Sequence, residues 1–181
     1  MKLLRTIRLD PSDTFVYEQA AEPGEWAVPG TFAFAAVDVA SLTGKARAAF
    51  RSGFLGIESL GRSTLVQVVE ASEKDRSAAV DLLARRLVER FGAPDLAAAK
   101  AAAEEELAYA ASLSDHAEGM VIALARRHEG GDIREAFRTL APGVAARPHR
   151  VLAFVEDKSE EEEAAPVEEI DLLALAKGKR P

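Results

Sequence analysis

The sequence contains no cysteine and only three histidines, which are scattered at His116, His128 and His149. Cysteine and histidine supply most protein nucleophiles, general bases and transition-metal ligands. The missing cysteines exclude a thiolate enzyme, a cysteine-ligated iron–sulfur site and any disulfide within this chain. The wide spacing of the histidines predicts no bound metal, and no motif indicates a cofactor. Because no catalytic motif fills this gap, the sequence favours a protein without enzymatic activity.

Long uncharged apolar runs are also missing. Charges interrupt the opening MKLLRTIRLD every few residues, and no uncharged run approaches the ~20 residues of a membrane-spanning helix. The net charge of −7 comes mostly from the chain after residue 155, which carries nine acids and four bases. The rest of the chain is nearly neutral and has no electrostatic footprint for nucleic acid. We therefore expect a cytoplasmic protein that binds neither membrane nor nucleic acid.

Composition divides the chain into two parts. Residues 1–156 carry regular apolar patterns and predict a single globular domain, whereas residues 157–181 begin with an acidic run and predict a disordered tail. Four consecutive glutamates occupy positions 160–163 of this tail. Beyond them, Val167, Ile170 and Leu173 repeat at helical spacing and form a short apolar stripe. Such a stripe is typical of a segment that binds a groove on a partner, or one that folds back on its own domain.

The apolar periodicity predicts an α+β fold with a mostly antiparallel sheet of five to seven strands and an αα-hairpin packed on one face. Two long helices, starting after Ser72 and at Pro94 and separated by Gly92, would form this hairpin. A shorter helix is expected at 41–51. Asp132 and Glu135 resemble a capping box that opens another helix ending at Leu140. Strands are expected at 3–9, 15–18, 31–39, 54–58, 63–70, 119–126 and 149–156.

One cluster of cations is a candidate ligand site. Lys45, Arg47, Arg51 and Arg62 lie in a stretch whose only acid is Glu58. Arg47 and Arg51 are four residues apart and share a helix face, and guanidinium groups bind carboxylates and phosphates in bidentate geometry. The cluster predicts either a site for a small anion or acidic peptide, or an ordinary solvated helix face, which is the commoner outcome.

Trp26, the sole tryptophan, is a candidate interface residue. It stands between the steps Pro23-Gly24 and Pro29-Gly30, and the segment is expected to form an ordered loop or an irregular edge. Together with the nearby Phe32 and Phe34, it would either anchor a protein interface or fold inward and close the edge of the sheet.

Three segments, MKLLRTIRLD at 1–10, EWAVPG at 25–30 and KARAAFRSGFLG at 45–56, resemble a proteobacterial family of unknown function. The resemblance extends over most of residues 1–155 and implies no particular activity and no catalytic residue. Relatives in this family are associated with genes around molybdenum-dependent and iron–sulfur redox enzymes. The resemblance therefore implies an accessory role beside such an enzyme.

The sequence as a whole predicts a non-catalytic cytoplasmic protein that binds another protein as an accessory factor or small subunit. The candidate interaction residues are Trp26, Val167, Ile170 and Leu173. The alternative is an enzyme or binding protein for a small anionic ligand, held by Lys45, Arg47, Arg51 and Arg62. Self-association into a homo-oligomer is left open.

Overall fold

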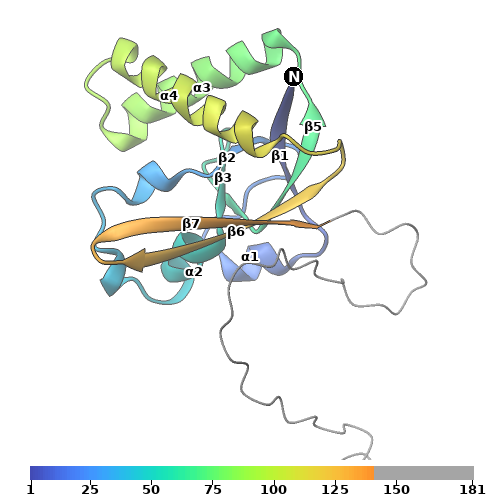
Figure 1. Ribbon diagram of the computed structural model, residues 1–181. Helices are drawn as coiled ribbons and strands as arrows, with labels where there is room; N and C mark the ends of the chain where they lie inside the picture. Colours follow the sequence, from blue (N-terminus) through green and yellow to red (C-terminus); the bar gives the residue numbers. More distant parts are fainter. Residues whose placement is uncertain (141–181) are drawn as a thin grey trace, which may run out of the picture.

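The computed structural model describes residues 1–140 and has the predicted α+β fold (Figure 1). At its centre is a curled seven-stranded sheet in the order β4-β3-β2-β1-β5-β6-β7, in which all neighbouring strands are antiparallel. The number of strands lies within the predicted range. The strands are β1 (Lys2–Ile7), β2 (Trp26–Val28), β3 (Phe54–Gly56), β4 (Arg62–Ser63), β5 (Leu65–Glu70), β6 (Val121–Glu129) and β7 (Asp132–Leu140).

The predicted αα-hairpin is confirmed and consists of α3 (Glu73–Phe91) and α4 (Leu96–Leu113). Ser72 and Asp75 form a capping box at the start of α3, which satisfies backbone N–H groups that the first helical turn leaves free. Ala99, Ala103 and Ala110 of α4 are buried, and such small side chains allow close packing on α3. Because α4 also lies against β1 and β2, the hairpin covers one side of the sheet, above it in Figure 1.

The hydrophobic core fills the space between this hairpin and the sheet. Every member of the core cluster from α3 and α4 is an alanine, a leucine or a valine, and the sheet contributes larger side chains as well. Its least exposed large members are Leu3, Leu4, Phe54, Leu55, Ile57, Leu83, Leu107 and Ile122.

Two shorter helices, α1 (Ser12–Val16) and α2 (Gly44–Ser52), lie away from α3 and α4, near the β6–β7 hairpin in Figure 1. The helix predicted at 41–51 is confirmed as α2, although it begins three residues later because Ser41 ends a 3-10 turn, η2 (Val39–Ser41). α2 packs beside β6 and against α1. Its buried Phe50 meets the Phe34 ring edge-on, with 5.3 Å between the ring centroids.

The strand predicted at 15–18 is wrong, because residues 12–16 form α1. The turn residues before it start a helix: Asp10 accepts a hydrogen bond from the Ser12 backbone at 2.7 Å, and the Thr14 hydroxyl donates to the Pro11 carbonyl at 2.6 Å. Local hydrogen bonds of this kind compete with extended structure. The buried residues are then Asp13 and Tyr17, at the i,i+4 spacing of one helix face.

The strand predicted at 31–39 is also wrong. Gly30 has a φ of 70°, a left-handed conformation that glycine adopts readily, and it turns the chain out of β2 into a 3-10 helix, η1 (Thr31–Phe34). As a result, the two phenylalanines of η1 pack against different helices. Phe32 meets Phe91 of α3 at 5.1 Å between ring centroids, whereas Phe34 meets Phe50 of α2. The ordered loop or irregular edge expected around Trp26 is also wrong, because residues 26–28 form β2, an inner strand in which Trp26 pairs with Arg5.

The helix predicted to open at Asp132 is wrong, and residues 132–140 form β7 instead. Gly130 and Gly131 both have positive φ, 61° and 91°, and they connect β6 to β7 as a two-residue hairpin turn. Glu135 therefore does not cap a helix. It lies opposite Arg126 of β6, so both side chains point to the same face of the hairpin.

The strand predicted at 149–156 and the tail at 157–181, including Val167, Ile170 and Leu173, lie outside the described residues. In the part of the chain that is described, no helix is both long and apolar enough to cross a membrane.

Candidate functional site

α1 is held to the rest of the domain by polar side chains. The Asp13 carboxylate accepts hydrogen bonds from the Thr64 hydroxyl at 2.6 Å and from the Thr64 backbone at 3.1 Å. The Tyr17 hydroxyl lies 2.9 Å from the Thr64 hydroxyl and 3.3 Å from that of Ser52 at the end of α2. These contacts fix α1 between the start of β5 and the end of α2.

α1 exposes apolar side chains as well as its polar Ser12 and Thr14. Phe15 is 74% exposed and Val16 is also exposed, and Leu9, just before the helix, is 69% exposed. A solvated helix normally turns its apolar residues inward and its charged residues outward. α1 does the reverse, because it buries Asp13 and exposes Phe15. Three of the eight large hydrophobic residues exposed in the described chain fall within positions 9–16.

α2 carries three cations, and the first of them, Lys45, lies next to the end of α1. Lys45, Arg47 and Arg51 are all exposed, and α2 contains no acid. The Lys45 ammonium group reaches the Tyr17 carbonyl at 3.4 Å, which joins the start of α2 to the end of α1. We define the α1–α2 face as Leu9, Phe15, Val16, Lys45, Arg47 and Arg51, of which Lys45 lies toward α1 whereas Arg47 and Arg51 share another side of α2. Among residues 1–140, none of its three cations has a carboxylate within 4.0 Å.

Arg62, the fourth member of the predicted cation cluster, turns inward instead. Its guanidinium carbon lies 4.9 Å from the centroid of the Phe34 ring, and Nη1 donates to the Gly53 carbonyl at 3.5 Å. Burial, together with the nearby Arg126, lowers the pKa of Arg62 to about 10. The structure thus divides the cluster into three exposed cations on α2 and one half-buried cation under Phe34.

Trp26 is partly buried and packs against the hydrophobic core. The Arg5 guanidinium stacks over its ring, 3.7 Å from the ring centroid. Arg5 also donates to the Gly24 carbonyl at 2.5 Å, so the cation that covers Trp26 is itself held in place.

A buried arginine, Arg126 of β6, joins β6 to the end of α2 and to the residue that follows β2. Its side chain is fully buried, and Nη1 donates to the carbonyls of Phe50 and Gly53 at 3.1 Å each. These carbonyls lie at the C-terminal end of α2, where helical carbonyls lack intrahelical partners and favour a cation. Nη2 donates to the Pro29 carbonyl. Because all three guanidinium nitrogens already have partners inside the protein, Arg126 is a brace and not a ligand-binding group.

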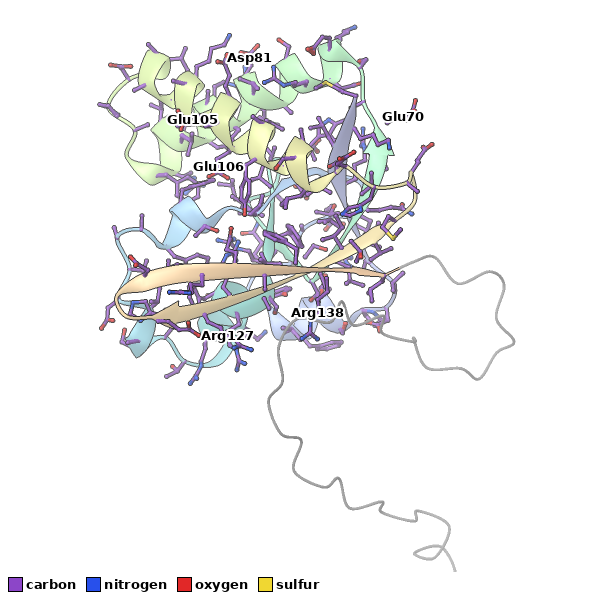
Figure 2. The ribbon with its side chains drawn as sticks, viewed as in Figure 1. Glu70, Asp81, Glu105, Glu106, Arg127 and Arg138 are labelled. Carbon is purple, nitrogen blue, oxygen red and sulfur yellow. The ribbon has the colours of Figure 1, made fainter. Side chains whose placement is uncertain are left out.

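Glu135 of β7 neutralises Arg126. Its Oε1 accepts from Arg126 Nε at 2.8 Å and from the Thr31 hydroxyl, while Oε2 accepts from the Tyr109 hydroxyl at 3.1 Å. Glu106 of α4 approaches the same group, and Figure 2 shows it on the side of α4 that faces the β6–β7 hairpin. Its Oε2 is buried and has no hydrogen-bond partner among residues 1–140.

Burial raises the pKa of Glu106 to about 7, and the negative charge of Glu135 adds to the increase. A carboxyl with a raised pKa binds a proton in the folded state that the unfolded chain releases. Its contribution to stability is therefore greatest below the ordinary value of 4.5 and is lost as the pH rises through about 7. The cluster is thus a proton-binding site within the fold. Among residues 1–140, no three histidine or carboxylate side chains gather as metal ligands would.

Glu106→Gln is expected to stabilise the protein at pH 8 by about 2 kcal/mol relative to wild type and to have little effect at pH 5. The amide keeps the shape of the side chain and removes the buried charge. Urea unfolding at both pH values measures the effect. Glu105→Gln, an exposed change one residue away, is the control. If the free energy of unfolding of Glu106→Gln differs from that of wild type by the same amount at both pH values, Glu106 does not have a raised pKa.

The comparisons with known proteins agree with the resemblance of the three segments. No curated protein and no solved structure matches the chain. The model of a family described as "Family of unknown function (DUF6505)" matches residues 1–153, which include all three segments, the α1–α2 face and the Arg126 brace. The chain therefore belongs to the Family of unknown function (DUF6505).

Proposed function

We propose that this protein is a non-catalytic, cytoplasmic protein-binding protein and that the α1–α2 face is its binding surface. The observation that carries the proposal is the inverted α1, which buries Asp13 through hydrogen bonds and leaves Phe15 74% exposed. Aromatic side chains are frequent anchors of protein interfaces, where they fill a pocket on the partner. The polar anchoring of α1 presents Phe15 in a fixed position, which lowers the entropic cost of binding.

The chemistry of the α1–α2 face indicates the kind of partner. An apolar pocket or groove would receive Phe15, and acidic groups beside it would pair with Lys45, Arg47 and Arg51. The resemblance to relatives associated with molybdenum-dependent and iron–sulfur redox enzymes makes a subunit of such an enzyme the first candidate. We infer an accessory role because no set of reactive side chains lies on this face.

Phe15→Asp is expected to weaken partner binding about 10- to 100-fold, which corresponds to losing the burial of one phenylalanine side chain. Folding stability should change little, because Phe15 contacts the domain only sparsely. Affinity capture from the native cell followed by quantitative mass spectrometry compares the two chains. Leu96→Asp is the matched control, because Leu96 is 57% exposed at the start of α4. Capture that is unchanged by Phe15→Asp, or is reduced equally by Leu96→Asp, would contradict the proposal.

A small anionic ligand is the second candidate, favoured by the three cations of α2 that have no carboxylate within 4.0 Å among residues 1–140. Guanidinium groups suit carboxylates and phosphates. Isothermal calorimetry with a dicarboxylate and with inorganic phosphate tests this candidate. Binding that Arg47→Ala with Arg51→Ala abolishes would support it, whereas no heat from either ligand would leave protein binding as the function of this face.

A further inference from the structure

The α1–α2 face has the chemistry to receive a segment that this chain itself carries. We propose that residues 160–174 dock on the α1–α2 face of the same molecule and compete there with the partner. The inference rests on the proposed function, because it assigns an intramolecular occupant to the same surface. It predicts a protein that partly masks its own binding site.

Charge and apolar complementarity support this choice of occupant. Residues 160–174 contain seven acids and no base, and the apolar residues Val167, Ile170 and Leu173 repeat among them. The α1–α2 face offers Lys45 next to the end of α1 and the exposed apolar residues Leu9, Phe15 and Val16, with two further cations on α2. An acidic segment with an apolar stripe complements the apolar residues around α1 and the cation at its end.

The place where the described chain ends supports the same choice. Leu140, the last residue of β7, lies opposite Val121 of β6, which in turn lies opposite Gln67 of β5. Thr64, which holds α1 through Asp13, precedes β5 directly. Two strand spacings, ~10 Å, therefore separate the end of β7 from the strand next to α1.

The length of chain between the two points does not limit docking. Twenty residues lead from Leu140 to Glu160, and they span up to ~70 Å when fully extended. A tether of this length gives the linked segment an effective concentration in the millimolar range. Even a weak contact is then mostly formed, and added salt weakens it because part of the attraction is electrostatic.

Binding of a labelled synthetic peptide, residues 158–176, to the full chain tests the proposal by fluorescence anisotropy. The variant Ile170→Ser with Leu173→Ser should bind the peptide about tenfold more tightly than wild type, because its own segment no longer competes. Leu172→Ser with Leu175→Ser is the matched control and should bind the peptide as wild type does. Phe15→Ser should abolish binding, and 0.5 M salt should weaken it.

Equal affinity of wild type and the Ile170→Ser/Leu173→Ser variant would overturn the proposal, since the tail would then not occupy the face. Peptide binding that survives Phe15→Ser, or no binding to any chain, would overturn it as well. None of these results affects the capture experiment. A partner lost on Phe15→Asp would still support the proposed function, so the two failures are distinguishable.

Discussion

Replacing Arg126 with leucine is expected to lower the free energy of unfolding by about 3 to 5 kcal/mol. The guanidinium donates to Pro29, Phe50 and Gly53, and these carbonyls would lose their partner. Glu135, only 12% exposed, would keep its charge without a counter-ion. Breaking a buried pair by removing one partner is costly for this reason. Urea unfolding at constant pH measures the change.

Arg127→Leu is the matched control for this prediction, because Arg127 is the next residue of β6 and is exposed on the opposite face (Figure 2). It should change stability by no more than about 0.5 kcal/mol. Arg126→Lys keeps the charge but loses the planar fork of donors, and it should fall between the two. If the free energies of unfolding of Arg126→Leu and Arg127→Leu differ by less than about 1 kcal/mol, Arg126 does not hold β6, α2 and the end of β2 together.

Glu25→Ala is expected to cost about 3 kcal/mol of stability. Glu25 is 4% exposed, and its carboxylate accepts backbone hydrogen bonds from Glu22 at 2.6 Å, from Ser59 at 2.9 Å and from Glu58 at 3.1 Å. One side chain thus joins the turn before β2 to the turn after β3. Alanine would leave these backbone N–H groups without a partner, and each buried unsatisfied donor costs about 1 to 3 kcal/mol.

Glu22→Ala is the control for Glu25, since the Glu22 side chain is 75% exposed and only its backbone takes part in the contact. It should leave stability nearly unchanged. Thermal unfolding compares the variants, with a shift of about 10 °C expected for Glu25→Ala and almost none for Glu22→Ala. Equal melting temperatures for the two variants would show that water replaces the Glu25 carboxylate without cost.

The elements predicted correctly from the sequence are those whose signals are local. The capping box of Ser72 and Asp75, together with Gly92 between the helices, marks the αα-hairpin, because capping depends on residues a few positions apart. The β-branched run around Val66 and Val68 likewise predicts a central strand. These features need no knowledge of the rest of the fold.

The elements predicted wrongly are those that distant contacts decide. Asp132 and Glu135 have the spacing of a capping box, but the glycine pair before them forms a hairpin turn and Arg126 binds Glu135. In β6 the sequence holds a usable signal, because Arg126 follows Ile122 and Leu124 at every second position and so points to the same buried face. An arginine at such a position predicts a buried charge with a partner.

The candidate site was partly visible in the sequence. The cation cluster was identified from the sequence, and all of its members but Arg62 of β4 are exposed. The apolar half of the face was missed, because Phe15 and Val16 look like a strand when the hydrogen bonds of Asp13 to Thr64, 51 residues later, are not known. Only the tertiary contact reveals which side of α1 faces outward.

Site-specific photo-crosslinking from position 15 in the native cell tests the central claim most directly. A benzophenone amino acid replaces Phe15, which keeps an aromatic group on the α1–α2 face, and the same amino acid at Leu96 serves as the control. The account predicts a discrete crosslinked protein from position 15 and none from position 96. No adduct from position 15, or the same set of adducts from both positions, would contradict the claim that this face binds a specific protein.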